Sequence, residues 1–197
     1  LYEVDTRLRP SGRSGLLVSS VGALARYQRE DAWTWEQQAL LRTRAVAGDA
    51  SVRRAFEHLR VDILQNAVRR DTLREEVISM RERMWRELSS SGADSFDIKR
   101  DPGGVGDIEF IVQYLVLAHA DRHRSLLHYT DNIRQLGVLA TCGILDGATA
   151  LRLQDIYRTY RRRLHHLALD HQDTSVPAGE FAAEADAVRG IWRQTFG

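Results

Sequence analysis

The sequence has few of the residues that mark disulfide-bonded or loop-rich proteins. Cys142 is the single cysteine, so no disulfide can form within the chain. One cysteine fits a reducing, cytoplasmic compartment. Only three prolines occur in 197 residues, and long stretches therefore carry no helix breaker. We expect a cytoplasmic protein in which helix dominates.

An excess of one charge and long apolar runs are also missing. The chain has 28 basic and 27 acidic residues, a net charge of +1. Such a balance gives no general attraction to nucleic acid or to an anionic membrane. The most apolar run, residues 108–120, contains Glu109, Gln113 and His119 and is too short to span a bilayer. We expect neither nucleic acid nor a membrane as a partner.

Apolar residues recur at helical spacing through most of the chain. This periodicity predicts helices over residues 21–29, 33–46, 51–68, 72–88, 105–119, 131–143 and 148–171, and a last helix opened by Pro177 and Glu180. The helix over 105–119 is apolar nearly all round and should form the buried centre. Residues 89–106 are predicted to be a loop with a short alternating segment at 96–99. Nothing after residue 20 predicts a sheet, so the fold class is mainly α, a helical bundle.

The first twenty residues predict a β-hairpin in front of this bundle. Side chains alternate along a strand, so Glu3, Asp5, Arg7 and Arg9 would share one face. Residues 10–15 suit a tight turn, and residues 16–20 would form the return strand. Because an isolated hairpin is barely stable, we expect it to belong to a sheet that lies mostly before residue 1.

The charged face of this hairpin has two interpretations. Carboxylates are ligands for Mg²⁺, and arginine makes bidentate contacts to phosphate, so Glu3 and Asp5 could hold a metal beside Arg7 and Arg9. Alternatively, charged side chains protect an exposed edge strand against aggregation. Spacing alone favours the second interpretation.

A second candidate is the glycine-rich loop before the central helix, residues 99–109. Backbone N–H groups at a helix start attract anions, and Gly103 and Gly104 precede the start while Lys99 adds positive charge. Asp107 lies in the first turn and would repel phosphate unless a cation intervenes. The alternative is a helix entry whose acids satisfy the helix dipole. A phosphate-binding P-loop is excluded, because the Gly-Lys-Ser/Thr ending is absent.

Two further clusters carry weaker signals. The pair His119 and His123 has helical spacing, but no third metal ligand is obvious, so solvated histidines are the preferred interpretation. The long helix over 148–171 carries a basic patch that we expect to face solvent or to pair with neighbouring helices; its members are Arg158, Arg161, Arg162, Arg163, His165 and His166.

Five stretches together resemble the glutamine synthetase adenylyltransferase family. They are residues 2–12 (YEVDTRLRPSG), 32–40 (AWTWEQQAL), 46–49 (VAGD), 101–115 (DPGGVGDIEFIVQYL) and 164–169 (LHHLAL). The resemblance implies nucleotidyltransferase halves of the DNA polymerase β superfamily. One half attaches AMP to a tyrosine of glutamine synthetase, and the other removes it by phosphorolysis. The chain looks more like the second, adenylylating half.

The resemblance also implies a domain organisation and a site. Residues 1–49 would end the α/β catalytic domain, and residues 50–197 would form the helical bundle. Asp5 matches the third of three carboxylates that hold Mg²⁺, with Glu3 as the next candidate, and the other two carboxylates are not in this chain. The residues expected at the phosphates of ATP are Arg7, Arg9, Lys99, Gly103 and Gly104.

The implied partners are glutamine synthetase and a PII-type signal protein. With one of three metal carboxylates, the chain by itself should be inactive. Three alternatives stay open. The chain could be a non-catalytic helical regulatory or protein-binding module, part of the adenylyl-removing half, or a relative of the PII uridylyltransferase.

Overall fold

The protein is built around one buried helix, α5 (Val105–His119). The structure is a computed structural model that describes residue 12, residues 15–88, residue 92 and residues 94–197. Within these residues seven more α-helices, one 3₁₀ helix and two strands accompany α5: α1 (Val21–Glu30), α2 (Thr34–Leu41), α3 (Ala50–Asn66), α4 (Leu73–Leu88), β1 (Ser95–Asp97), η2 (Arg124–Leu127), α6 (Asn132–Thr141), α7 (Gly147–Leu169), β2 (Ser175–Pro177) and α8 (Ala182–Phe196).

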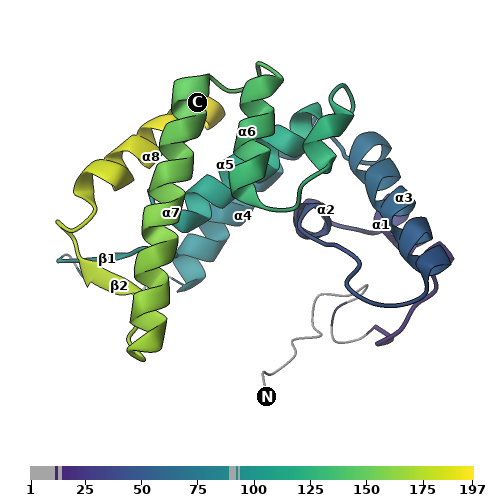
Figure 1. The fold of residues 1–197 in the computed structure, drawn as a ribbon, viewed down its shortest axis with the longest axis horizontal. Coiled ribbons are helices and arrows are strands. Elements are labelled where there is room, and N and C mark those ends of the chain that lie inside the picture. The colour runs from purple at the N-terminus through teal and green to yellow at the C-terminus, as the bar shows by residue number, and fades with distance from the viewer. Residues whose placement is uncertain (1–11, 13–14, 89–91, 93) are drawn as a thin grey trace.

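The central helix is buried because its apolar side chains face every neighbour. It contacts α2, α4, α6, α7 and α8, which surround it in Figure 1. Ile108, Ile111 and Val116 have no exposed surface, and burying such a side chain contributes about 1.5–3 kcal/mol. Its buried amide at Gln113 accepts a hydrogen bond of 3.0 Å from Gln38 of α2. The predicted helix over 105–119 is confirmed.

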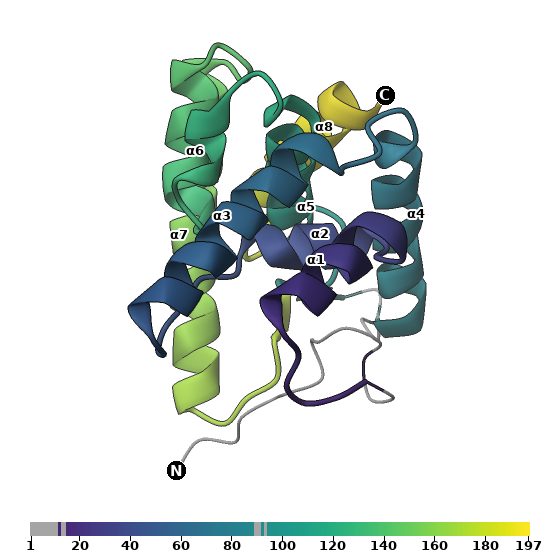
Figure 2. The same ribbon diagram turned by 90° about the vertical axis from the view of Figure 1, so that its right-hand side faces the viewer.

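The other helices form two groups around α5. Helices α6 and α7 pack against each other, and α4 and α8 contact α5 as well (Figure 1). Helices α1 and α2 pack on α3, and α2 also reaches α4 and α5 (Figure 2). Residues 21–41 are therefore packed onto the bundle; the proposed domain boundary at residues 49 and 50 stays a prediction.

Side-chain caps fix where several helices begin. The oxygens of Ser20, Asp49 and Asp146 each accept a hydrogen bond from a backbone N–H in the first turn of α1, α3 and α7. Asp131 caps α6 in the same way, at 3.0 Å from the N–H of Arg134. Such caps stabilise a helix by about 1 kcal/mol.

The predicted helix over residues 33–46 is too long. Helix α2 ends at Leu41, because the chain then turns. The hydroxyl of Thr43 donates to the carbonyl of Ala39 at 2.9 Å, and the N–H of Ala45 donates to Glu57 of α3 at 3.2 Å. These contacts replace the hydrogen bonds of a further helical turn.

The predicted return strand over residues 16–20 is wrong. Residues 15–20 form bends and extended backbone without a strand. Leu16, Leu17 and Val18 are largely exposed, by 81%, 67% and 79%. A strand needs a paired neighbour to satisfy its backbone, and none pairs with this segment among the described residues. The first arm of the predicted hairpin lies outside the described residues.

A small sheet forms where the sequence predicted a loop. β1 and β2 pair antiparallel, with Phe96 opposite Val176. The buried carboxylate of Asp97 fixes this pairing: it accepts the hydroxyl of Thr174 at 2.8 Å and the N–H of Lys99 at 2.8 Å. Because each strand has three residues and the two lie far apart in sequence, local alternation carries almost no signal for either.

Candidate functional site

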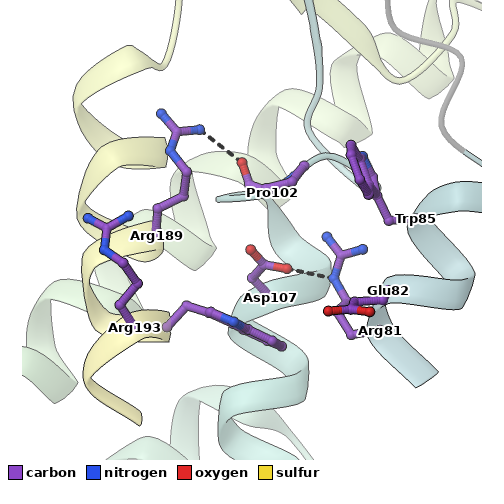
Figure 3. A pocket seen from close by; sticks show the side chains of 8 residues that line it. Arg81, Glu82, Trp85, Pro102, Asp107, Arg189 and Arg193 are labelled. Carbon is purple, nitrogen blue, oxygen red and sulfur yellow. Dashed lines mark hydrogen bonds and ion pairs between the residues drawn. The ribbon is translucent and has the colours of Figure 1, made fainter. Parts of the chain in front are cut away.

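A buried ion pair holds the glycine-rich loop between β1 and α5. The Nε of Arg81, from α4, lies 2.6 Å from a carboxylate oxygen of Asp107, and the two side chains are 8% and 6% exposed. The Nη2 of Arg81 also donates to the carbonyl of Arg100 at 2.8 Å. The second oxygen of Asp107 accepts the N–H of Gly103 at 2.6 Å. Figure 3 shows the pair, with α8 at the left and α4 at the right.

Two glycines allow this loop to pack closely. Gly103 has a φ of 93°, and a Cβ there would lie 2.6 Å from the carbonyl oxygen of Ala185 in α8. A Cβ at Gly104 would lie 2.4 Å from the carbonyl oxygen of Ile98. The hydroxyl of Tyr160 in α7 donates to the carbonyl of Gly103 at 3.0 Å. The loop therefore joins α4, α5, α7 and α8.

Three N–H groups at and just before the start of α5 are already used inside the loop. That of Gly103 bonds to Asp107, and those of Gly104 and Val105 bond to loop carbonyls at 2.9 and 2.8 Å. A phosphate could bind these three groups only by breaking these bonds. The contacts favour a helix entry whose acid satisfies the dipole, one of the two interpretations that the sequence allowed. No contact tests a nucleotide role for Gly103 or Gly104.

Electrostatics in the loop follow from its burial. Burial raises the pKa of the Asp107 carboxyl, and the charge of Arg81 together with the N–H of Gly103 opposes part of that rise. Burial likewise raises the pKa of the Tyr160 hydroxyl, which therefore stays protonated as a donor to the loop.

Beside the loop, Glu109 of α5 is the centre of a polar network. Its carboxylate lies 3.1 Å from a guanidinium nitrogen of Arg42 and accepts the hydroxyl of Tyr157 at 2.9 Å. Asn132 donates to the same hydroxyl oxygen at 3.0 Å. Burial and the Glu109 charge raise the pKa of Tyr157; burial alone would lower the pKa of Arg42, but Glu109 raises it on balance. The network joins the end of α2 to α5, α6 and α7.

Two cavities flank the loop. One, of about 240 Å³, opens between α4 and α8 (Figure 3). There Arg189 donates to the carbonyl of Pro102 at 2.9 Å. The residues that line it are Arg81, Glu82, Trp85, Pro102, Asp107, Arg189, Trp192 and Arg193. Two tryptophans thus share this cavity with three arginines and two acidic side chains.

The other cavity, of about 530 Å³, opens on the opposite side of the loop, toward α7. Lys99, the single lysine of the sequence, lines it together with Arg100, Arg161, His165 and Glu109. Lys99 is exposed, so its ammonium group is available to an anion. Of the site residues predicted from the sequence and described by the structure, Lys99 is the one that faces an open cavity.

The predicted metal face of the hairpin cannot be placed. Glu3, Asp5, Arg7 and Arg9 lie outside the described residues, so a cleft between Asp5 and the loop stays a prediction. Within the described part of the chain, no three His, Cys, Asp or Glu side chains are grouped to hold a metal ion. None of the helices described is long and apolar enough to cross a membrane.

Sequence reasoning missed the two side chains that organise the loop. Arg81 lies four residues after Val77, on the buried side of α4, and a charged residue at such a position signals a buried partner. Tyr160 lies on the buried side of α7, and no sequence signal indicates that its hydroxyl donates to the loop. Their partners in the loop are set by tertiary packing.

Comparison with known proteins identifies the family. Residues 1–59 match the family described as glutamate-ammonia ligase adenylyltransferase. The chain is 53% identical over 194 residues to the bifunctional glutamine synthetase adenylyltransferase/adenylyl-removing enzyme of Thioalkalivibrio sulfidiphilus. The chain belongs to this enzyme family. The corresponding enzyme of Mannheimia haemolytica is 46% identical over 194 residues, and that of Pasteurella multocida 43% over 196.

These alignments cover 98–100% of the chain, which spans about 20% of the length of the curated relatives it matches. Residues 71–177, more than half of the chain, also belong to the family described as GlnD PII-uridylyltransferase. Residues 71–177, which include helices α4 to α7, thus resemble a second family as well. The resemblance inferred from the sequence motifs is confirmed.

Replacing Gly104 by alanine should destabilise the protein, because the new Cβ would meet the backbone carbonyl of Ile98. We expect the free energy of unfolding to fall by about 1–3 kcal/mol, measured by urea denaturation. Gly190→Ala in α8 is the matched control, since its Cβ would meet nothing within 4 Å; it should be neutral or stabilising by up to about 1 kcal/mol. Equal losses in both variants would contradict the close packing of this loop.

Replacing either partner of the buried ion pair should destabilise the protein. We expect Arg81→Met and Asp107→Asn each to lower the free energy of unfolding by about 3–5 kcal/mol. The double variant should lose less than the sum, with a coupling of about 1–3 kcal/mol. The exposed pair Arg86 and Glu82, in the same helix at 2.8 Å, is the control. A double-mutant cycle on this exposed pair should give a coupling energy of about 0.5 kcal/mol or less. An equally small coupling energy between Arg81 and Asp107 would refute the structural role of the buried pair.

Proposed function

We propose that this chain is part of the half of its enzyme that transfers AMP from ATP to a tyrosine hydroxyl of glutamine synthetase. The observation that carries this proposal is the 53% identity along 98% of the chain to an enzyme named for that activity. The Trp-Thr-Trp-Glu segment at residues 33–36 supports the adenylylating half rather than the adenylyl-removing half.

In this proposal Asp5 holds a catalytic metal ion, with Glu3 as the next candidate. Mg²⁺, when bound, would stabilise charge on the phosphates of ATP, as in other two-metal phosphoryl transfers. Arg7 and Arg9 would steady those phosphates through bidentate contacts. These four residues precede the described part of the chain, and their roles rest on the resemblance of residues 2–12 to the family.

The described residues would contribute a rigid support for Lys99. The ion pair of Arg81 with Asp107 and the hydrogen bond from Tyr160 fix the loop on three helices. Because the backbone of this loop is held in place, only the side chain of Lys99 has to become ordered when its ammonium group binds an anion. We infer that Lys99 is directed toward a nucleotide phosphate, while Gly103 and Gly104 make the loop tight enough to hold it in place.

A second candidate function is a non-catalytic one. Residues 71–177 also belong to the PII-uridylyltransferase family, which supports a helical module that two different enzymes share. Such a module would bind glutamine synthetase or a PII-type signal protein and relay regulation. The two candidates differ in whether residues of this chain affect the chemical step.

In the intact enzyme, Asp5→Asn should abolish AMP transfer while leaving the fold intact, because it removes a metal-ligand charge but keeps the shape. We expect a loss of at least about a hundredfold, measured by transfer of label from ATP to glutamine synthetase. Asp155→Asn, an exposed carboxylate of α7, is the control. Phosphorolytic removal of AMP is measured in parallel: a loss confined to removal would place the chain in the other half, and unchanged activity would exclude Asp5 from the metal site.

Lys99→Ala should raise the apparent KM for ATP or lower kcat in the intact enzyme, because a positive charge near the phosphates is lost. Lys99→Arg keeps the charge and should retain most of the activity. Steady-state kinetics at varied ATP measure both effects, and thermal unfolding of each variant tests the fold. A lowered melting temperature with unchanged ATP kinetics would leave Lys99 without a role at the nucleotide and would favour the non-catalytic module.

A further inference from the structure

A groove along α7 carries cations that the proposed AMP transfer does not use. The cavity of about 530 Å³ beside the loop and a neighbouring one of about 430 Å³ are both lined by Arg161 and His165. The two cavities therefore adjoin at these side chains, and we refer to them together as the groove. The helix extends beyond α6 at its C-terminal half, where these residues lie (Figure 1).

The spacing of the basic residues places them on one face of α7. Arg158, Arg161, Arg162 and His165 stand at helical positions i, i+3, i+4 and i+7, and all four line the groove. The neighbouring Arg163 is absent from this lining and pairs with Glu180 at 2.7 Å. The basic patch seen in the sequence thus divides into a paired part and a groove-facing part.

Several of the groove cations lack an acidic partner. Arg158 pairs with Asp155 at 2.9 Å, but no carboxylate among the described residues lies within 4 Å of Arg161 or Arg162. The nearest polar contact of the Arg161 guanidinium is His165, at 3.4 Å.

The carboxylate that lines the groove is already paired. It belongs to Glu109, which lies 3.1 Å from a guanidinium nitrogen of Arg42 and accepts the hydroxyl of Tyr157. The groove is therefore locally positive on a chain whose total charge is only +1.

Apolar side chains lie between these charges. Val105, Phe110, Leu164 and Met84 line the larger cavity. Highly charged inorganic anions gain nothing from such a surface, whereas a peptide can place its own apolar side chains there. From Arg158 to His165 the helix rises about 10 Å, which is the length of about three residues in extended conformation.

We propose that this groove binds a short acidic segment of a protein partner in extended conformation. Carboxylates of the segment pair with Arg161 and Arg162, and its intervening side chains contact Leu164 and Phe110. Because the cations are exposed, binding is fast and weakens with salt. A long nucleic acid is disfavoured, since the remainder of the chain adds no net positive charge. Lys99 also lines the larger cavity, but the inference is argued from Arg161 and Arg162 and requires neither ATP nor a metal, so its test is separate from the test of AMP transfer.

The test uses the 197-residue chain and a fluorescein-labelled peptide of about eight residues in which glutamates alternate with leucine or alanine. Fluorescence anisotropy at low salt should show binding, and the matching glutamine peptide should bind at least about tenfold more weakly. Arg161→Glu/Arg162→Glu should weaken binding of the acidic peptide at least about tenfold. Arg53→Glu/Arg54→Glu, adjacent exposed arginines of α3, makes the same charge change away from the groove and should alter binding by less than about twofold.

Each opposite result overturns the proposal. These results are the absence of binding to the unaltered chain, equal binding of the glutamine peptide, or equal weakening by the α3 control. Inorganic triphosphate is added as a competitor of the peptide, and sodium chloride at equal ionic strength is the control. If triphosphate displaces the peptide and the salt does not, the groove is a small-anion site. The neutral variant Arg161→Gln/Arg162→Gln should show a loss of peptide binding smaller than that of the charge-reversed variant. Circular dichroism of both variants tests whether either loss comes from misfolding.

Discussion

The buried ion pair between Arg81 and Asp107 is the contact on which the rest of this structure depends. Two charges removed from water are stable only when each finds further hydrogen bonds, and both do: Arg81 also bonds to the carbonyl of Arg100, and Asp107 accepts the N–H of Gly103. Because these bonds need one geometry of the loop, the pair specifies where α4 lies relative to the start of α5. An apolar pair could fill the same volume but would not fix the loop.

The fixed loop in turn sets the positions of α7 and α8. Tyr160 donates to the loop from α7, and the backbone at Ala185 of α8 lies so close that a glycine is required opposite it. The two cavities are consequences of this arrangement, one on each side of the loop. The cavity lined by Trp85 and Trp192 lies between α4 and α8, as Figure 3 shows, and the basic groove lies toward α7. Positive charge is thus concentrated on a rigid surface, although the chain as a whole is nearly neutral.

This architecture connects the family to its proposed chemistry. A nucleotidyltransferase needs cations held in place more than it needs a covalent nucleophile, because phosphoryl transfer depends on positioning and charge stabilisation. In the proposed function Lys99 of the loop would take that role, and α7 carries a second set of cations. Residues 71–177 also match the PII-uridylyltransferase family, so this part of the chain resembles a second family.

The sequence by itself determined the features that depend on neighbouring residues. Apolar spacing located α5 at residues 105–119, a single aspartate marked the start of α6, and contiguous motifs identified the family, because helix periodicity, capping and motif identity are all local. Tertiary structure decided the rest. The end of α2 depends on Glu57 of another helix, and the β1–β2 pairing on a contact from Asp97 to Thr174. The ion-pair partner of Arg81 likewise depends on which groups, far away in sequence, lie close in space, and so does the absence of a strand at residues 16–20. A local sequence pattern does not encode such contacts.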